Sequence, residues 1–214
     1  MLIGLEQPTA GRIVVCGRER PAGRVGAAER RRRGRELQIV FQDPYTSLDP
    51  QQTIGACLAE VIGAQFDMGR TERQRAVSEL LEQVGLQPAY AASRPRDLSG
   101  GQRQRVAIAR ALAAKPQVLI LDEAVAALDV SVQAQVLNLL ADIREQTGMT
   151  YLFISHDLAV VRQVSDRVIV MHRGHIVETG RTEDVLTAPV DPYTRRLRAA
   201  VPGPGWTPAS ATDA

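Results

Sequence analysis

The residue types best suited to chemistry lie in two short groups, a Ser-Gly-Gly loop ahead of a helix and a pair of carboxylates behind a strand. Ser99 is a good helix N-cap, and Gly100 and Gly101 behind it have no Cβ, so a ligand can approach their backbone closely. The helix that follows begins with unpaired N–H groups at the positive end of its dipole. The loop is therefore predicted to bind a phosphate group.

The carboxylate pair, Asp122 and Glu123, follows the wholly apolar run Val118–Leu121. Such a run is typical of a strand buried on both faces of a parallel sheet, and open α/β sheets bind ligands at the carboxyl ends of their strands. One carboxylate would then hold Mg²⁺ and the other would act on a water molecule. For an isolated Asp-Glu pair an acidic turn is the simpler interpretation, but the Ser-Gly-Gly loop upstream favours the catalytic one.

Five motifs of the sequence follow the order found in the ATP-binding cassette (ABC) family, and the sequence resembles the nucleotide-driven subunits of ABC transporters. The signature loop, the Walker B strand, the D-loop, the switch histidine and the Q-loop glutamine correspond to Leu98–Gln102, Leu119–Glu123, Ala127–Asp129, His156 and Gln42. The resemblance extends over roughly residues 1–201.

The resemblance implies a role for each of these residues. Asp122 and Gln42 would hold Mg²⁺. Glu123 and His156, together with Gln42, would position the attacking water and the γ-phosphate during hydrolysis of ATP. In the family two ATPase subunits stack head to tail around ATP and Mg²⁺, and the residues implied to bind the nucleotide are Ser99, Gly100, Gly101, Gln102 and Asp129.

The resemblance also implies an α/β fold of the P-loop NTPase (RecA-like) type, a mostly parallel sheet with an inserted ABC helical subdomain. The expected parts are an N-terminal part of the ATPase core ending in the Q-loop (1–48), a helical signature subdomain (49–113), a RecA-like core with Walker B, D-loop and switch histidine (114–188), and a C-terminal helix with a disordered tail (189–214). Tyr151–Ile154 is predicted to be a second buried strand that places His156 beside the Asp122 strand.

The phosphate-cradling P-loop of the family, GxxxxGK[ST], does not occur in these 214 residues. Its lysine reaches the β- and γ-phosphate oxygens, but the only lysine of the chain, Lys115, lies before Pro116 with no glycine-rich loop ahead of it. Residues 2–11 resemble the passage that follows the P-loop helix in the family. We therefore expect the first strands and the P-loop to be missing upstream, and the chain alone neither to bind ATP tightly nor to hydrolyse it.

A dense arginine run, Arg30–Arg33 with Arg35, lies between residues 17 and 36. Binding to nucleic acid or lipid is one interpretation, and a solvated loop or helix face is the favoured one. The net charge of +2 gives no strong case for a nucleic-acid partner. The two cysteines, Cys16 and Cys57, have no metal-binding or redox spacing, which favours a reducing compartment.

Three functions are open at this point. The first is an ATPase subunit of an oligopeptide or dipeptide importer, the branch that Tyr45–Pro50 and Pro192–Thr194 resemble. The second is a non-hydrolysing partner whose signature loop completes a neighbour's ATP site. The third, an ABC ATPase without membrane partners, is ranked last because the sequence has no long coiled coil or tandem cassette.

For the first function, the resemblance implies transmembrane permease subunits and, indirectly, a solute-binding protein as partners. The protein is then expected in the cytoplasm, on the inner face of the bacterial plasma membrane. No apolar run approaches the roughly 18 residues of a membrane span, so we expect any attachment to the membrane to be made through a partner.

Overall fold

A computed structural model describes residues 2–4, 6–20, 23, 25–43 and 47–200, and the chain divides into two compact units, Met1–Ile154 and Ser155–Ala214. The expected disordered tail at 201–214 lies outside the described residues, as do residues 44–46 behind the Q-loop glutamine.

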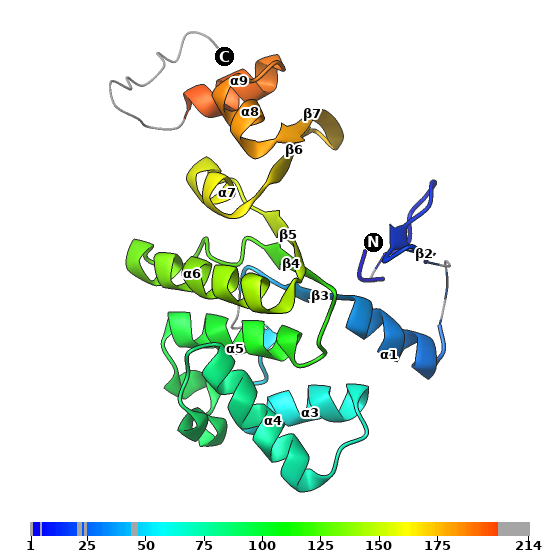
Figure 1. Ribbon diagram of the computed structural model, residues 1–214, viewed down its shortest axis with the longest axis vertical. Coiled ribbons are helices and arrows are strands. Elements are labelled where there is room, and N and C mark those ends of the chain that lie inside the picture. The colour runs from blue at the N-terminus through cyan, green and yellow to red at the C-terminus, as the bar shows by residue number, and fades with distance from the viewer. Residues whose placement is uncertain (1, 5, 21–22, 24, 44–46, 201–214) are drawn as a thin grey trace. The chain divides into compact units, whose positions relative to one another are not determined.

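The first unit is built on a parallel sheet of three strands in the order β3-β4-β5 (Figure 1). These strands are β3 (Leu37–Val40), β4 (Val118–Asp122) and β5 (Thr150–Ile154). β4 lies in the middle, with Leu119 and Leu121 fully buried. The predicted parallel sheet and its buried central strand are therefore confirmed.

The strand β5 corrects one expectation, because it is not buried. Leu152 is 39% exposed and Ile154 is 46% exposed. β5 pairs with β4 on one side, and in the described part of the chain no strand pairs with its other side. The exposed residues alternate along the strand, so it is one face of the sheet at β5 that stays accessible, although the strand itself forms where it was predicted.

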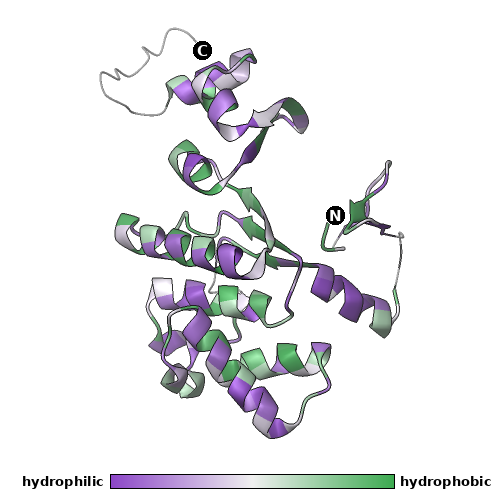
Figure 2. Cartoon of the chain, viewed as in Figure 1, coloured by the Kyte–Doolittle hydropathy of each residue, from purple (hydrophilic) through white to green (hydrophobic). Residues whose placement is uncertain are grey.

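The described residues of the first unit also form five α-helices and two short 3-10 segments. Their bounds are α1 (Ala27–Glu36), α3 (Ile54–Gln65), α4 (Arg70–Gln83), η1 (Pro88–Ala92), η2 (Pro95–Asp97), α5 (Gly100–Leu112) and α6 (Val130–Thr147). α5 packs against β3, against α6 and against the pair α3 and α4. In Figure 2 the sheet strands are largely hydrophobic, whereas α1 is largely hydrophilic.

The ends of these helices follow from local signals in the sequence. The side chains of Thr53, Ser99 and Asp129 cap α3, α5 and α6 by accepting backbone N–H groups of the first turn. Gly148 ends α6 in the left-handed conformation, with φ of 65°, which a residue without Cβ adopts at low cost. α5 is thus held at its N-terminus by a serine and lies in the centre of the unit.

The N-terminal segment forms a small hairpin of β1 (Val14–Val15) and β2 (Arg18–Glu19). Val15 packs with Leu37 of β3 and Ile120 of β4 in a hydrophobic cluster. This contact attaches the hairpin to the parallel sheet.

The second unit contains α7 (Leu158–Val164), the antiparallel hairpin β6 (Arg167–His172) and β7 (His175–Arg181), α8 (Thr182–Thr187) and α9 (Pro192–Ala199). Its last helix is tied to the hairpin by two contacts. The carboxylate of Glu178 accepts the backbone N–H groups of Val190 and Asp191, at 2.9 and 3.1 Å. The ring of His172 stacks on Tyr193 with centroids 3.9 Å apart.

Within the described ranges, no helix combines the length and the hydrophobicity that crossing a bilayer requires.

Candidate functional site

The Ser-Gly-Gly loop opens the 13-residue helix α5, as the sequence predicted. Ser99 Oγ accepts the backbone N–H of Gln102 at 3.3 Å, and Gln102 Oε1 accepts the backbone N–H of Ser99 at 2.8 Å. This reciprocal pair is a capping box, which fixes the first turn of the helix. Ser99 itself is exposed, so the start of α5 is open to a ligand.

The two glycines of the loop serve different purposes. A Cβ at Gly100 would meet no atom within 4 Å, so the backbone there is free for close approach by an anion. A Cβ at Gly101 would lie 2.4 Å from Cγ1 of Val132 in α6. Gly101 is therefore needed for the close packing of α5 on α6, a reason that the sequence alone did not reveal.

The D-loop residue Asp129 is the N-cap of α6. Its carboxylate accepts the backbone N–H of Val132 at 3.0 Å and the hydroxyl of Ser131 at 2.7 Å. These two hydrogen bonds, the backbone one first, lower the pKa of Asp129. Ser131 was not singled out from the sequence, although a hydroxyl two residues behind an N-cap aspartate is the available signal.

Two helix N-termini meet at this edge of the unit. The contact of Gly101 with Val132 places the first turn of α5 against the first turn of α6. Beside it, Val130 is 85% exposed. The signature loop and the D-loop therefore form one continuous accessible edge, at which both helices begin.

The carboxylate pair lies at the carboxyl end of the central strand. Asp122 is the last residue of β4 and pairs with Ile154 of β5. Glu123 donates its backbone N–H to the carbonyl of Ile154 at 3.0 Å and has φ of 47°, in the left-handed region. For a residue with a Cβ this conformation costs about 1–2 kcal/mol. The residue to which the family resemblance gives a catalytic role thus has a strained backbone.

Gln42 lies at the same edge of the sheet as the carboxylates. β3 ends at Val40, which pairs with Leu121, and Gln42 follows two residues later as an exposed side chain. Because β3 and β4 are neighbouring parallel strands, their carboxyl ends carry Gln42 and Asp122 to one edge.

The predicted switch histidine, His156, belongs to the second unit, where it is exposed. Its neighbours have local structural tasks. Asp157 caps α7 by accepting the backbone N–H groups of Ala159 and Val160, and Ser155 Oγ accepts the N–H of Asp157 at 3.0 Å. The Ser-His-Asp context that drew attention to His156 is therefore a helix start in the structure.

The carboxyl edge suits Mg²⁺ only in the company of a nucleotide. In the described part of the chain no three His, Cys, Asp or Glu side chains gather as a metal site. Mg²⁺ is commonly held by one or two protein ligands and by the phosphates of a nucleotide. The carboxylate of Asp122 and the amide oxygen of Gln42 fit that limited role.

The lysine of the chain is used away from this edge. Lys115 Nζ lies 5.5 Å from the ring centroid of Phe66, and the guanidinium of Arg35 lies 4.4 Å from the same centroid. For an exposed lysine such as Lys115 a cation–π contact is worth about 0.5–1 kcal/mol. The described residues therefore supply a signature loop and a carboxylate edge, and Lys115 does not serve as a phosphate-binding lysine.

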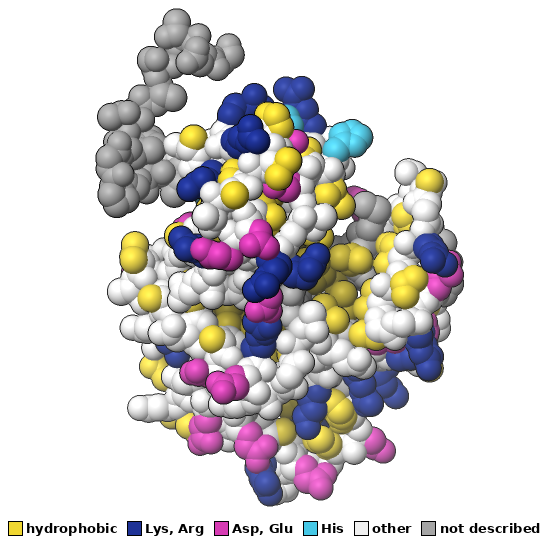
Figure 3. Space-filling view, turned by 45° about the horizontal axis from the view of Figure 1, so that its top comes forward, with side chains coloured by type: hydrophobic (Ala, Val, Ile, Leu, Met, Phe, Trp, Pro, Cys, Tyr) yellow, Lys and Arg dark blue, Asp and Glu magenta, His cyan; other side chains and the backbone are white. Residues whose placement is uncertain are grey.

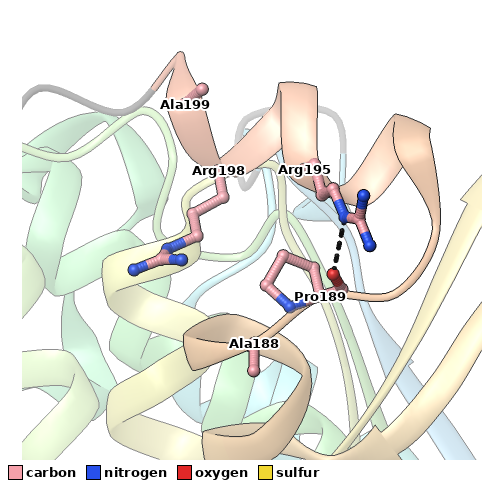
Figure 4. Close-up of a pocket in the computed structure, with 5 residues that line it drawn as sticks. All are labelled: Ala188, Pro189, Arg195, Arg198 and Ala199. Carbon is pink, nitrogen blue, oxygen red and sulfur yellow. Dashed lines mark hydrogen bonds between the residues drawn. The ribbon is translucent and has the colours of Figure 1, made fainter.

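Two pockets of the structure lie elsewhere than the motifs. One, of about 780 Å³, is lined by residues of the N-terminal segment, α1 and β3 and by no motif residue. The other, of about 440 Å³, lies in the second unit beside Pro189, where Arg195 Nε donates to the Pro189 carbonyl at 2.9 Å (Figure 4). The guanidinium groups of Arg195 and Arg198 point away from each other there, so they do not converge on one ligand.

Proteins with similar sequences are named as ATP-binding proteins of import systems, which is consistent with the five motifs. A protein of Brucella abortus strain 2308 described as a peptide import ATP-binding protein is 48% identical over 202 residues, which are 94% of this chain and 60% of that protein. The glutathione import ATP-binding protein GsiA of Pectobacterium atrosepticum is 52% identical over 78% of this chain and 27% of its own length. The chain thus spans about three fifths of the length of the peptide-import relatives it matches.

Solved structures with a similar fold are ABC cassettes. The dimeric post-hydrolysis state of the ATP-binding cassette MJ0796 bound to ADP and Pi matches 84% of this chain and 77% of its own, with a TM-score of 0.72 and 28% identity. CbiO1 of Clostridium perfringens, part of the ABC transporter complex cbiONQ, matches 87% of this chain and 72% of its own, with a TM-score of 0.76 and 27% identity. The P-loop NTPase-like fold class is confirmed by these neighbours.

The family model described as ABC transporter matches residues 1–126, a region that includes the Q-loop glutamine, the signature loop and the carboxylate pair. With more than half of its length matched by that model, the chain belongs to the ABC transporter family.

Proposed function

We propose that the chain is part of an ATPase subunit that powers the import of peptides or related small solutes. The names of relatives that match 94% and 78% of the chain support the substrate class. The observation that carries the proposal is the signature loop, which opens α5 with an exposed Ser99 and with a Gly100 whose backbone faces open space.

The loop is suited to receive the γ-phosphate of an ATP molecule held by a second cassette. The first N–H groups of α5 and the positive end of its dipole attract a phosphate. The neighbouring start of α6, with exposed Val130, offers the same edge to a partner. This arrangement favours a head-to-tail pair in which the signature loop of this chain closes over the nucleotide of its neighbour.

The carboxyl edge of the sheet has three of the side chains proposed for the hydrolytic step on the chain's own side, and the second unit has the fourth. Asp122 and Gln42 would hold Mg²⁺, which supplies charge stabilisation to phosphate oxygens when it is bound. Glu123 would accept a hydrogen bond from the attacking water, and His156 would orient the γ-phosphate. These roles need a phosphate-cradling loop in addition to the four side chains.

As the 214 residues stand, the second candidate function is a non-hydrolysing partner that completes the ATP site of a neighbour. The specific observation in its favour is Lys115, the only lysine of the 214 residues, which lies beside Phe66 and has no glycine-rich loop before it. Both candidates use the signature loop in the same way, so one experiment tests their common part.

The proposal includes a place for the protein and its partners. We place the chain at the cytoplasmic face of the plasma membrane, bound to permease subunits. A solute-binding protein would be an indirect partner through those subunits. It does not include nucleic acid, since acidic and basic side chains both occur over the face in Figure 3 and two arginines of the N-terminal run contact backbone carbonyls of α3.

The test is ATP-dependent assembly. The 214-residue chain is mixed with a complete peptide-import cassette whose catalytic glutamate has been replaced, and association is measured by analytical ultracentrifugation with and without Mg-ATP. We expect association only with Mg-ATP, and we expect Ser99→Arg to abolish it because the larger cation fills the start of α5. Gln74→Arg, which adds the same charge to the exposed surface of α4, is the control. Association without Mg-ATP, or association by the Ser99→Arg variant equal to that of the wild-type chain, would overturn the proposal.

A further inference from the structure

The side chain of Gln102 contacts a residue outside the signature loop as well as Ser99 within it. Its Oε1 accepts the N–H of Ser99, while its Nε2 donates to the phenolic oxygen of Tyr90 at 2.8 Å. Both ends of the amide are therefore used. Exchanging the oxygen and the nitrogen would set the amide NH₂ against the N–H of Ser99, so only one orientation satisfies both partners.

Tyr90 is itself held in a fixed position by its backbone. It lies in η1, where its N–H donates to the carbonyl of Gln87 and its carbonyl accepts the N–H of Ser93, both at 3.0 Å. The carbonyl of Ser93 in turn accepts the N–H of Ile54, the first residue of α3, at 2.9 Å. The hydroxyl of Tyr90 is thus presented by a segment that is hydrogen-bonded to the start of another helix.

The packing beneath η1 leaves little freedom for movement. A Cβ added to Gly55 of α3 would lie 2.9 Å from the carbonyl oxygen of Ala91. Such close approach shows that the backbones of η1 and α3 are packed with no room for a side chain between them. The contacts therefore form a continuous path from the beginning of α3, through Tyr90 and Gln102, to the N–H of Ser99.

We propose that Tyr90 is a positioning residue for the signature loop. It acts through Gln102, whose amide it orients, and so sets the direction in which the first N–H groups of α5 point. Donors that stabilise a phosphate act only when they are held within about 2.7–3.1 Å of its oxygens, so a small rotation of the loop weakens all of them together. The phosphate in this argument rests on the proposed function, whereas the positioning of the loop is a property of the chain itself.

The first test is residue-specific hydrogen exchange by NMR on the 214-residue chain without nucleotide. Tyr90→Phe removes only the hydroxyl. We expect the backbone N–H groups of Ser99 and Gln102 to exchange roughly three- to tenfold faster, the effect of losing one hydrogen bond of ordinary strength. Protection in α4 and α6 should stay near its wild-type level, and the melting temperature should fall by no more than about 2–4 °C, the shift that a loss of about 1 kcal/mol gives in a protein of this size.

The control variant is Tyr151→Phe, which also removes a tyrosine hydroxyl from the first unit. That hydroxyl donates to the carbonyl of Leu140 at 2.9 Å, so its loss should leave exchange at Ser99 and Gln102 unchanged. Unchanged exchange at those two groups in Tyr90→Phe would overturn the proposal. So would a uniform rise over α3, α4 and α5, because that result describes a general loss of stability.

A second measurement asks whether Tyr90 acts through Gln102. In a Gln102→Ala background the hydroxyl of Tyr90 has no amide to orient, so adding Tyr90→Phe should leave exchange at Ser99 as it is in Gln102→Ala alone. Additive effects of the two substitutions would contradict the proposal.

The assembly assay separates this inference from the proposed function. When the wild-type chain associates with a complete cassette in Mg-ATP, Tyr90→Phe should weaken that association roughly three- to tenfold, and equal association would refute the positioning role. If the wild-type chain does not associate, the proposed function fails, and the exchange measurements still decide the role of Tyr90.

Discussion

Gly100 and Gly101 are neighbours in the sequence, yet a methyl group added to each would meet different surroundings. At Gly100 it would enter open space, and at Gly101 it would lie 2.4 Å from Val132 Cγ1. We expect Gly101→Ala to lower the free energy of unfolding by about 1–3 kcal/mol, because α5 and α6 must separate to accept it. Gly100→Ala should change it by less than about 0.5 kcal/mol. Urea denaturation of both variants measures the difference, and equal costs would show that Gly101 is not a packing residue.

Glu123 combines a proposed catalytic carboxylate with a left-handed backbone, φ of 47°. Glu123→Gly and Glu123→Ala both lose the carboxylate, so a comparison between them isolates the cost of the backbone. We expect the glycine variant to be more stable than the alanine variant by about 0.5–1 kcal/mol, since glycine adopts this conformation without a Cβ clash. Thermal unfolding of the pair checks this, and an alanine variant of equal or greater stability would refute the claim of strain.

Local chemistry made several residues of the site predictable. Ser99 as an N-cap and Asp122 at a strand end follow from residue type and from the apolar run beside them. The packing task of Gly101 and the strain at Glu123 did not follow. Both depend on which segment lies opposite, Val132 in one case and the carbonyl of Ile154 in the other, and residues far apart in sequence do not reveal such contacts.

At the scale of elements, α1 and the end of α3 are joined by the arginine run. Arg31 Nε donates to the carbonyl of Ala64 at 2.8 Å, and the guanidinium of Arg35 donates to the carbonyl of Gln65. These are carbonyls of the last turn of α3, where cations are favoured by the unpaired acceptors and by the negative end of the helix dipole. The sequence offered two interpretations of this arginine run, a binding patch and the favoured solvated face. In the structure, Arg31 and Arg35 cap another helix.

This contact gives a prediction for the first unit. Replacing Arg31 and Arg35 together by glutamine should lower the free energy of unfolding by about 1 kcal/mol, because two carbonyls lose their charged donors. It should also speed hydrogen exchange at the N–H of Phe66, which closes the last turn of α3. Arg30→Gln, at an exposed arginine of the same helix, is the control. Equal effects of the control and the double variant would contradict a capping role.

In the second unit, Glu178 makes the attachment of α9 dependent on pH. The hydrogen bonds from the N–H of Val190, then from the side chain of Thr194 and then from the N–H of Asp191 lower the pKa of this carboxyl. A pKa that is lower in the folded state gives a stabilisation that is complete above the unfolded value of about 4.3 and is lost as the pH falls through the folded value.

We therefore expect protection of the Val190 and Asp191 N–H groups to fall on acidification from about pH 5 to about pH 3. Glu178→Gln should remove most of that pH dependence. Glu183→Gln, which removes the exposed partner of Arg162, should leave it in place. Hydrogen exchange over this range measures the effect, and a pH dependence that survives Glu178→Gln would assign it to another group.

The elements show where sequence patterns suffice and where they do not. The bounds of α6 and α9 follow from an N-cap aspartate together with a terminal glycine or a first-turn proline, all of which act within a few residues. The exposure of β5 does not follow, because an apolar run predicts burial on both faces, whereas alternate residues of β5, Leu152 among them, lie on a face of the sheet that stays accessible.

At the scale of the whole molecule, the chain divides its chemistry between two units. The signature loop, the D-loop, the carboxylate pair and Gln42 belong to the first unit, and His156 belongs to the second. The loop and the D-loop share an edge built from two helix starts. That edge offers donors to a phosphate from outside the chain, whereas a triphosphate held by the chain itself needs a cradle of backbone N–H groups with a lysine.

The last prediction therefore concerns ATP binding by the chain alone. Because Lys115 lies against Phe66 and the 214 residues contain no GxxxxGK[ST] loop, we expect isothermal titration with Mg-ATP to give no micromolar binding and no steady release of phosphate. A chimera with the P-loop segment of a peptide-import relative placed before Met1 should bind Mg-ATP. The same chimera with Glu123→Gln should keep that binding and lose turnover, since the substitution removes the group that acts on the attacking water. Micromolar binding with turnover by the unmodified chain would show that another set of its backbone donors holds the triphosphate.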